Sequence, residues 1–412
     1  MHPTFLFIPL PVVLCIWAVV ALSVVAWSVY QAGWSADTWI TLLMMAAAGA
    51  GLYWFIPRLG ITDHGRVGLA IRGYGFFVAV GVLSAVALGC RLGQQLGFDR
   101  DTILTSAFYI VGCGIVGARL FYVIEYFDDF RRESASATVA AMLRFHEGGL
   151  VVYGGFIGAV VGFAAFVLRT KTPPLKLLDV YPSAMMVGLG FGRLGCLMNG
   201  CCWGGLCATA IAIAFPAGSP PYMRHLETGE LLGARLEPLE GGHRWRVVRV
   251  DSGSAAAAKG VHVGDEIIGR RLLMAPDDLR RVVRESRKNN GSRPVLEWTT
   301  TDRRRLVWRV QDLPAESLPV HPAQLYASVN AFLLAGLLYF YVGYRRRPGD
   351  VFALLITLYP VSRFLLERIR SDEPGIAGTS FTISQWVSIV LLLTATAWWV
   401  STRWIMARRS VV

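Results

Sequence analysis

The sequence predicts an all-α polytopic membrane protein with a small soluble α+β domain inserted between two of its membrane helices. Three observations support this fold class. Hydrophobic residues make up 54% and charged residues only 17% of the 412 residues, whereas a soluble domain contains roughly 25% charged residues. Apolar runs of about 20 residues, the length that crosses a bilayer core, recur along the chain. One long stretch between two such runs is charged and contains no apolar run of that length.

The apolar runs predict about nine membrane-spanning helices. The first run is longer than the core of a signal peptide and no basic segment precedes it, so we interpret it as a span rather than a cleaved leader. The predicted spans are residues 5–30, 39–56, 73–96, 103–124, 150–168, 178–204, 322–344, 351–369 and 383–405.

The distribution of basic residues predicts the topology. Loops rich in Arg and Lys stay on the cytoplasmic side of a membrane, and the clearest ones are residues 169–176, 345–347 and 403–409. We therefore expect a multi-pass membrane protein with a cytoplasmic C-terminus and an extracytoplasmic insertion. The net charge of +12 is spread over helix ends and the insertion. It indicates membrane anchoring and not nucleic-acid binding.

The insertion carries the pattern of a known peptide-binding module. Residues 247–267 contain a strand, a Ser-x-Ala helix, a glycine turn and a Gly-Asp-x-Ile strand, and the stretch 237–313 resembles a PDZ domain. A PDZ groove binds a peptide as an added strand, so a peptide ligand and a purely structural role are the two alternatives. The resemblance also implies a long helix at 277–285 and a hairpin of strands 295–299 and 306–310.

The sixth predicted span ends in the glycine-rich segment 192–204, which places Arg193 inside an apolar run. Glycines permit close helix approach or an unwound turn, and unwound backbone at membrane depth occurs beside protein or a wet cavity. An arginine at the centre of a span costs about 2.5–3.5 kcal/mol, and its guanidinium matches a phosphate. We expect Arg193 to face a cavity and bind a phosphate. The alternative is a side chain that extends to the membrane interface.

A second arginine lies in the eighth predicted span. Arg363 and Glu367 are four residues apart, which places them on one helical face, with Tyr359 one turn earlier. Such a pair can form a self-contained ion pair. We expect Arg370 to lie on the same face, where its surplus positive charge favours an anion.

Three further segments carry candidate site residues. Arg119 lies near the end of the fourth span, and His146 precedes the glycine-rich segment 148–155. His321 and Tyr326 lie at the start of the seventh span. Because a proline follows His321, this histidine is either a structural cap or a functional group.

Together these segments resemble the prolipoprotein diacylglyceryl transferase family. The resemblance implies an enzyme that transfers a diacylglyceryl group from phosphatidylglycerol to the lipobox cysteine thiol of a prolipoprotein, forms a thioether and releases glycerol phosphate. It implies no cofactor, and it implies a location in the bacterial inner membrane. The matching segments occur in the family's order, at residues 72–75, 117–122, 148–155, 192–204, 321–326 and 359–370.

The resemblance divides the chain into four parts. Residues 71–215 and 321–412 are the two parts of a transferase-like membrane core, and residues 216–320 are the insertion. The start of the chain also resembles the family, which indicates that residues 1–70 contain an extra transmembrane hairpin.

The resemblance implies that Arg193 and Arg363 hold the lipid phosphate. Displacement of a phosphate ester builds negative charge on the departing oxygens, and fixed guanidinium donors in a water-poor cavity stabilise that charge. Tyr153 and Glu367 complete the predicted catalytic set. The predicted substrate-binding residues are Tyr74, Arg119, His146, Asn199, Gly204, His321, Tyr326, Tyr359 and Arg370.

The chain departs from the family pattern at the position of the base. Tyr153 stands where many members carry a histidine, the usual candidate base. A tyrosine, with a pKa of about 10, is a poor base unless neighbouring arginines lower that value. His146, His321 or Glu367 can substitute for it, or Tyr153 orients the lipid.

The glycine-rich segment also departs from the family pattern. Cys196 and Cys201 stand where Asn and Glu are usual, and Cys202 and Cys207 follow. The seven cysteines lie in or beside apolar segments, which argues against a secreted disulfide framework. The spacing of these four cysteines can suggest a metal or redox site. The sequence nevertheless predicts no metal site, because the four cysteines include no Cys-x-x-Cys pair and no histidine stands nearby.

Two other functions remain open from the sequence alone. The altered base position and the insertion are compatible with a related phospholipid-dependent transferase that uses a different acceptor. A non-catalytic membrane scaffold that binds lipid or peptide is the other alternative. The expected partners of the transferase are phosphatidylglycerol, the lipobox region of a prolipoprotein and a peptide ligand of the PDZ-like insertion.

Overall fold

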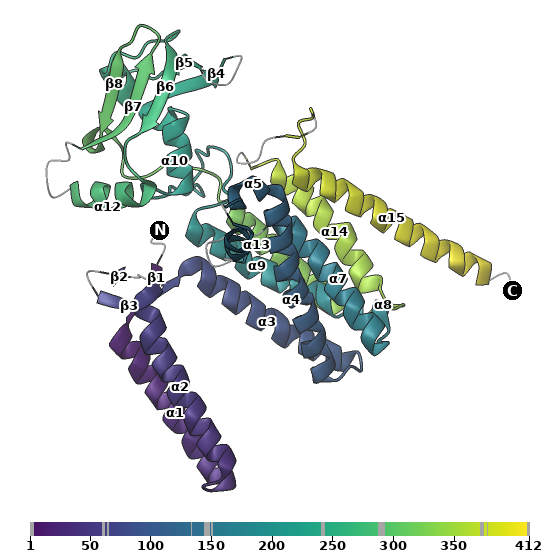
Figure 1. Ribbon diagram of the computed structural model, residues 1–412. Coiled ribbons are helices and arrows are strands. Elements are labelled where there is room, and N and C mark those ends of the chain that lie inside the picture. The colour runs from purple at the N-terminus through teal and green to yellow at the C-terminus, as the bar shows by residue number, and fades with distance from the viewer. Residues whose placement is uncertain are drawn as a thin grey trace. The chain divides into compact units, whose positions relative to one another are not determined.

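Figure 1 shows the helices and strands of a computed structural model of the chain. The chain forms two compact units. The first comprises Met1–Ala79, Gly192–Leu325 and Ile369–Asp372, and the second comprises Val80–Phe191, Tyr326–Arg368 and Glu373–Val412. The structure describes residues 4–59, 62–63, 66–132, 134–143, 149, 151–239, 244–286, 293–370, 375–376 and 378–409.

The first unit begins with a helical hairpin between the strands of a small antiparallel sheet. The strands are β1 (Thr4–Pro9), β2 (Thr62–Asp63) and β3 (Arg66–Arg72), in the order β1-β3-β2. The hairpin consists of α1 (Leu10–Ala32), α2 (Ala36–Phe55) and the 3₁₀ turn η1 (Ile56–Leu59). The prediction that residues 5–9 belong to the first span was wrong, since they are extended. Pro9 and Pro11 lack a backbone N–H and suit a helix start, so the helix begins at Leu10.

The insertion folds around a five-stranded antiparallel sheet with the strand order β4-β5-β6-β7-β8. Its strands are β4 (Ala234–Pro238), β5 (Trp245–Val250), β6 (Glu266–Leu272), β7 (Pro294–Thr300) and β8 (Arg305–Arg309). Its helical elements are α10 (Pro220–Glu227), η3 (Glu230–Leu232), α11 (Ala255–Ala258), α12 (Pro276–Ser286) and η4 (Val310–Asp312). Helix α12 and the paired strands β7 and β8 confirm the predicted long helix and hairpin.

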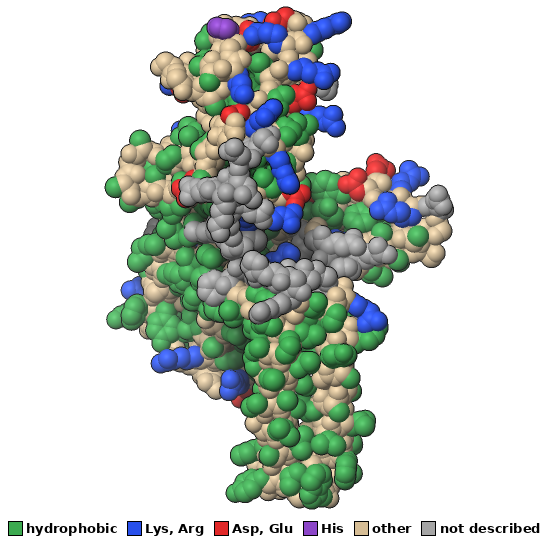
Figure 2. All heavy atoms as spheres, turned by 90° about the vertical axis from the view of Figure 1, so that its left-hand side faces the viewer, with side chains coloured by type: hydrophobic (Ala, Val, Ile, Leu, Met, Phe, Trp, Pro, Cys, Tyr) green, Lys and Arg blue, Asp and Glu red, His purple; other side chains and the backbone are tan. Residues whose placement is uncertain are grey.

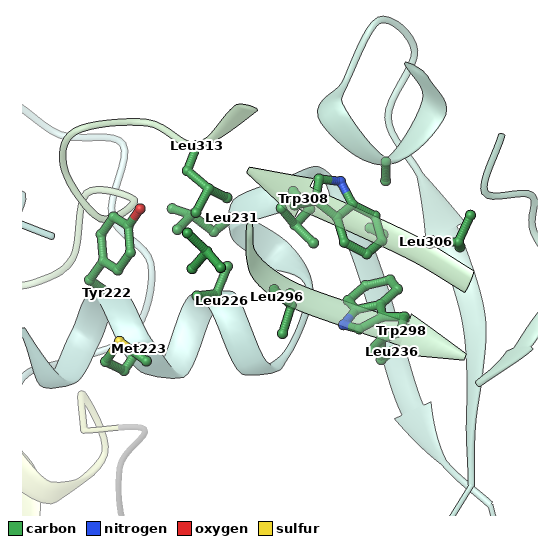
Figure 3. Close-up of a cluster of buried hydrophobic side chains, with 14 of the residues drawn as sticks. Tyr222, Met223, Leu226, Leu231, Leu236, Leu296, Trp298, Leu306, Trp308 and Leu313 are labelled. Carbon is green, nitrogen blue, oxygen red and sulfur yellow. The ribbon is translucent and has the colours of Figure 1, made fainter. Parts of the chain in front are cut away.

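Two tryptophans from the hairpin lie at the centre of the insertion's core. The rings of Trp298 and Trp308 pack edge to face at a centroid distance of 4.7 Å (Figure 3), and both side chains are fully buried. Trp308 Nε1 donates to the carbonyl oxygen of Ala255 at 3.2 Å. Burial lowers the pKa of His225 on α10, so this imidazole is a neutral member of the core. The insertion therefore has a hydrophobic core of its own.

The second unit is helical in the residues that the structure describes. Three of its helices, α3, α9 and α13, also extend into the first unit. The helices are α3 (Gly73–Gln95), α4 (Arg100–Glu125), α5 (Phe127–Phe130), α6 (Ala135–Met142), α7 (Val152–Thr170), α8 (Pro174–Leu178), α9 (Tyr181–Asn199), α13 (Ala323–Tyr341), α14 (Asp350–Glu367) and α15 (Ile383–Arg409).

Seven helices among the described residues are long and apolar enough to cross a membrane, namely α1, α2, α3, α4, α7, α13 and α15. The chain is thus a polytopic membrane protein. Many hydrophobic side chains lie on the face of the α1–α2 hairpin that Figure 2 shows, at the bottom of the view. The other two predicted spans form α9 and α14. Helix α14 carries Asp350, Arg363 and Glu367, and α9 carries Arg193.

Helices α4 and α7 approach each other closely through glycines. Gly154, Gly158 and Gly162 recur at intervals of four residues along α7 and are all buried. A Cβ atom at Gly158 would overlap the carbonyl oxygen of Cys113 on α4, and it would meet Gly117 Cα at 3.1 Å. Small residues at such intervals allow two membrane helices to bring their backbones together.

A buried carboxylate holds the start of α14. Asp179 accepts hydrogen bonds from the backbone N–H groups of Gly349 at 2.8 Å, Val351 at 3.0 Å and Phe352 at 3.2 Å. A negative charge is favourable at a helix N-terminus, where backbone N–H groups lack helical partners. Arg345 Nε lies 3.7 Å from the same carboxylate. Asp179 therefore fixes the helix that carries Arg363 and Glu367.

We expect Gly158→Ala to destabilise the protein, because the added methyl group would collide with backbone that cannot move independently of α4. Overpacking of this kind costs about 1–3 kcal/mol. Gly155→Ala is the matched control, since a Cβ atom there would lie 3.5 Å from Ala118 Cβ, an ordinary contact. Thermal unfolding in detergent should show a lower midpoint for Gly158→Ala alone. Equal midpoints for the two variants would contradict the close packing of α4 and α7.

Candidate functional site

The chain turns sharply where α9 ends at Asn199. Gly200 and Cys202 both adopt left-handed backbone conformations, with φ of 77° and 62°. The backbone N–H groups of Gly200 and Cys201 donate to the carbonyl oxygen of Cys196 at 2.9 and 3.1 Å. Positive φ is uncommon for a residue other than glycine and is often found at functional sites. The glycine-rich segment thus contains the unwound turn that the sequence suggested.

This turn brings three cysteines together. The Sγ atoms of Cys196, Cys201 and Cys202 all lie within 4.8 Å of one another. We call these three residues the thiol cluster. Cys201 Sγ donates to the carbonyl oxygen of Cys196 at 3.7 Å, whereas Cys207 Sγ contacts Thr209 Oγ1 at 3.0 Å. From the sequence, a metal or redox site at these cysteines was only an alternative, because their spacing contains no Cys-x-x-Cys pair.

The thiol cluster lies in a basic environment. The charges of Arg193 and Arg370 act on Cys202, and Tyr74 interacts electrostatically with Arg193 and with all three cysteines. Tyr74 also packs on the end of α9, since a Cβ atom at Gly195 would meet Tyr74 Cδ2 at 3.2 Å. The predicted residues Tyr74, Arg193 and Arg370 therefore lie near one group of thiols within the first unit.

Backbone hydrogen bonds join three distant segments next to this cluster. Gly204 N donates to His321 O, His321 N donates to Gly205 O, and Gly205 N donates to Ile369 O, each at 2.9 Å. Gly204 also forms a β-bridge with Arg370. We call this set of main-chain bonds the Gly204 clasp. A Cβ atom at Gly204 would lie 2.7 Å from His321 Cβ, so the clasp requires glycine at this position.

Gln324 is a site residue that the sequence analysis missed. Its side chain is fully buried, and its Nε2 donates to the carbonyl oxygen of Cys201 at 2.7 Å. Within the described part of the chain its Oε1 is buried without a hydrogen-bond partner. A glutamine at the start of an apolar span was the available signal, because a buried amide in a membrane helix needs polar partners.

Arg363 forms an ion pair in the second unit. Arg363 Nη2 lies 2.8 Å from Glu367 Oε2, and both side chains are largely buried. The same Nη2 donates to Ser384 Oγ at 2.9 Å, and Thr382 Oγ1 donates to Glu367 Oε1 at 3.2 Å. The ion pair anticipated from the spacing is confirmed. The expectation that Arg370 shares their helical face was wrong, because α14 ends at Glu367 and Arg370 enters the Gly204 clasp.

The structure gives Arg119 a set of backbone partners. Its guanidinium donates to the carbonyl oxygens of Met142 at 2.8 Å, Gly149 at 3.1 Å and Ala141 at 3.3 Å. A cation is favourable near the C-terminal end of a helix such as α6. These bonds fix the position of that segment.

The other predicted residues fall in different parts of the chain. Tyr153 lies in the first turn of α7 and its side chain is 37% exposed. Tyr326 on α13 and Tyr359 on α14 belong to the second unit. His146 lies outside the described residues.

Comparisons with known proteins give a consistent result. Residues 65–401 match the family described as prolipoprotein diacylglyceryl transferase. The phosphatidylglycerol–prolipoprotein diacylglyceryl transferase of Rhodopirellula baltica is 34% identical over 405 residues, which cover 91% of this chain and 82% of that protein. The second such transferase of Clostridium perfringens is 23% identical over 326 residues, covering 79% of this chain and 89% of that protein.

We predict that Gly204→Ala opens the clasp. The added Cβ atom collides with His321 Cβ, so the backbone bonds to His321 and Ile369 cannot keep their lengths. Gly205→Ala is the matched control, because a Cβ atom there would meet nothing closer than Ile369 O at 3.9 Å. Maleimide labelling followed by mass spectrometry should show faster modification of Cys201 and Cys202 in Gly204→Ala than in Gly205→Ala. Unchanged labelling in both variants would argue against the clasp.

Proposed function

The chain belongs to the prolipoprotein diacylglyceryl transferase family, and we propose that Arg193 and Arg363 bind the lipid phosphate during its reaction. The protein transfers a diacylglyceryl group from phosphatidylglycerol to the lipobox cysteine thiol of prolipoproteins, the first step of lipoprotein maturation. The similarity to the R. baltica transferase over 91% of the chain is the observation that carries this function.

The proposed roles follow from the charge that develops in the reaction. The thiol sulfur attacks a glyceryl carbon, the bond from that carbon to the phosphate oxygen breaks, and negative charge builds on the departing glycerol phosphate. Fixed guanidinium groups stabilise such charge more effectively in a water-poor site than in water. The position of Arg363 is fixed by Glu367 and Ser384. Arg193 belongs to the first unit, together with three further proposed substrate-binding residues, Tyr74, Asn199 and Arg370.

The reaction also needs the acceptor thiol in its ionised form. Glu367 is held in an ion pair, so protonating it would cost that interaction, and we assign it an orienting role for Arg363. We assign Tyr153 the orientation of the lipid, because an ordinary tyrosine is a poor base near neutral pH. The acceptor thiol, with a free pKa of about 8.5, then needs another group that favours its ionised form.

The proposed membrane topology has two spans in addition to the seven candidate helices. We propose that α9 and α14 also cross the membrane, which gives the nine spans expected from the sequence. The charged residues of α14 have partners inside the protein: Arg363 pairs with Glu367, and Asp350 accepts from the backbone N–H groups of Arg346 and Arg347. Paired charges are tolerated at membrane depth. The Arg- and Lys-rich loops support a cytoplasmic C-terminus and an extracytoplasmic insertion in the inner membrane.

The insertion is proposed to recognise protein substrates as a PDZ-like domain. Strand β4 lies at one edge of its sheet and pairs with β5, and an edge strand can accept an extended peptide as a further strand. Gly233, with φ of 74°, turns the chain directly before β4. A strand-addition site at this edge would select the proteins that reach the transferase.

We expect Arg193→Ala and Arg363→Ala each to reduce transfer by roughly 10²–10³-fold, the usual cost of removing one donor to a developing oxyanion. Purified protein, phosphatidylglycerol and a lipobox peptide are combined, and thioether product is measured by mass spectrometry. Arg131→Ala is the control, because that side chain is 74% exposed. Product from both alanine variants at the unmodified rate would refute the phosphate-binding roles, whereas no product from the unmodified protein would count against transfer to prolipoproteins.

Deletion of residues 237–313 should leave transfer to a short lipobox peptide intact and change the choice among full-length prolipoproteins. The deletion removes strands β5 to β8 and with them the sheet that carries the proposed recognition surface. Rates for a panel of prolipoproteins are compared with and without the insertion, with the short peptide as the internal control. Identical selectivity across the panel would exclude a role in substrate choice.

A further inference from the structure

We propose that Cys196, Cys201 and Cys202 bind a zinc ion as three thiolates, and that the open fourth position takes the acceptor's thiol as a thiolate. This proposal rests on the transferase function for the identity of the acceptor. The binding of zinc by the thiol cluster can be tested independently of that function.

The geometry of the cluster suits zinc. With Zn–S bonds of about 2.3 Å in a tetrahedral arrangement, neighbouring sulfur atoms lie about 3.8 Å apart. The three Sγ atoms are already within 4.8 Å of one another, so small side-chain rotations complete the site. They reach this position because Cys196 comes from the last turn of α9, while Cys201 and Cys202 come from the turn that follows. The left-handed conformation of Cys202 is part of that turn.

The charges around the cluster also suit zinc. Three thiolates and one Zn²⁺ carry about one surplus negative charge, and a buried charge needs a partner. Arg193 and Arg370 both act electrostatically on Cys202 and can balance this charge.

A buried polar group next to the cluster provides a second, independent observation. Gln324 is fully buried and bonds through Nε2 to the carbonyl oxygen of Cys201, and its Oε1 has no hydrogen-bond partner among the described residues. Buried amide oxygens are normally satisfied by protein or ordered water. Outer groups of this kind commonly orient the ligands of a metal and the water or substrate bound to it.

Three protein ligands are typical of a zinc site that keeps one position for water or substrate. The acceptor thiol replaces the water, and its proton is released to solvent when the Zn–S bond forms. The zinc-bound sulfur then attacks the glyceryl carbon as the carbon–oxygen bond to the phosphate breaks. The electron pair leaves on glycerol phosphate, and the thioether product dissociates from zinc. No redox change and no protein base are required.

Metal analysis of the full-length protein tests the site itself. Protein purified in detergent and dialysed against Zn²⁺ should retain one zinc ion per chain. Cys196→Ser, Cys201→Ser and Cys202→Ser should each weaken Zn²⁺ binding at least tenfold, whereas Cys15→Ser, an exposed cysteine on α1, should not. Absence of zinc, equal binding by all variants, or a disulfide among the three cysteines in the native protein would overturn the proposal.

Cobalt tests the open position. The visible absorption of Co²⁺ in the site should show tetrahedral thiolate coordination, and it should change when a lipobox peptide is added. A peptide with serine in place of the lipobox cysteine is the matched control and should leave the spectrum unchanged. If neither peptide alters the spectrum, the site has no position for the acceptor and this part of the proposal is wrong.

Activity separates the metal site from the transferase function. Removal of zinc with a chelator should reduce thioether formation at least tenfold, and added Zn²⁺ should restore it. Full activity of the zinc-free protein would reject the role of zinc and leave the transferase assignment in place. Stoichiometric zinc binding without transfer, in either form of the protein, would support the metal site and count against the transferase assignment.

Discussion

The Gly204 clasp is the constraint on which the arrangement of the first unit depends. It joins a segment that follows α9, a segment that precedes α13 and a segment that follows α14, through backbone hydrogen bonds of 2.9 Å. Backbone bonds of this kind tolerate no side chain at Gly204, where a Cβ atom would meet His321. The clasp thus explains why the glycine-rich segment 192–204 ends in glycine, and this explanation does not depend on ligand binding. Its consequence is chemical, because it holds Arg370 beside the thiol cluster.

Different partners offset the cost of burying each arginine in an apolar helix. Arg119 donates to the carbonyl oxygens of Ala141, Met142 and Gly149 and so orders a segment of backbone. Arg363 is held by a carboxylate and a hydroxyl group on neighbouring parts of the second unit. A buried guanidinium is therefore not evidence of a ligand site by itself. Arg193 differs in its surroundings, which are tyrosine and thiol side chains. These groups can accept hydrogen bonds from a guanidinium and leave some of its donors for a bound anion.

The sequence predicted those features that repeat along the chain. Apolar runs located the helices, and the pattern of the insertion located α12 and the hairpin of β7 and β8. Predictions failed where a regular element ends. Residues 5–9 were predicted to be helical. The helix begins only at Leu10, where the neighbouring prolines favour a helix start. Arg370 was placed on the face of Arg363 by helical periodicity, which stops applying after Glu367.

The features that the sequence could not predict depend on contacts between distant segments. The thiol cluster forms because the backbone adopts two left-handed residues after α9, and no periodicity encodes such a turn. Gln324 bonds to Cys201, which precedes it by 123 residues. Asp179 similarly caps α14 from far along the chain. A single sequence shows the residue types of such partners but not their pairing.

The departures from the family pattern make chemical sense when they are considered together. A histidine at the position of Tyr153 would accept a proton, and a carboxylate at the position of Cys201 would supply negative charge next to the arginines. A tyrosine accepts a proton poorly at neutral pH, so this chain has lost a base at the first position. Thiolates at the second position retain the negative charge and add a strong affinity for a soft metal ion. A metal ion lowers the pKa of a coordinated thiol directly. In this chain, a metal ion held by the thiol cluster can thus ionise the acceptor thiol in place of a protein base.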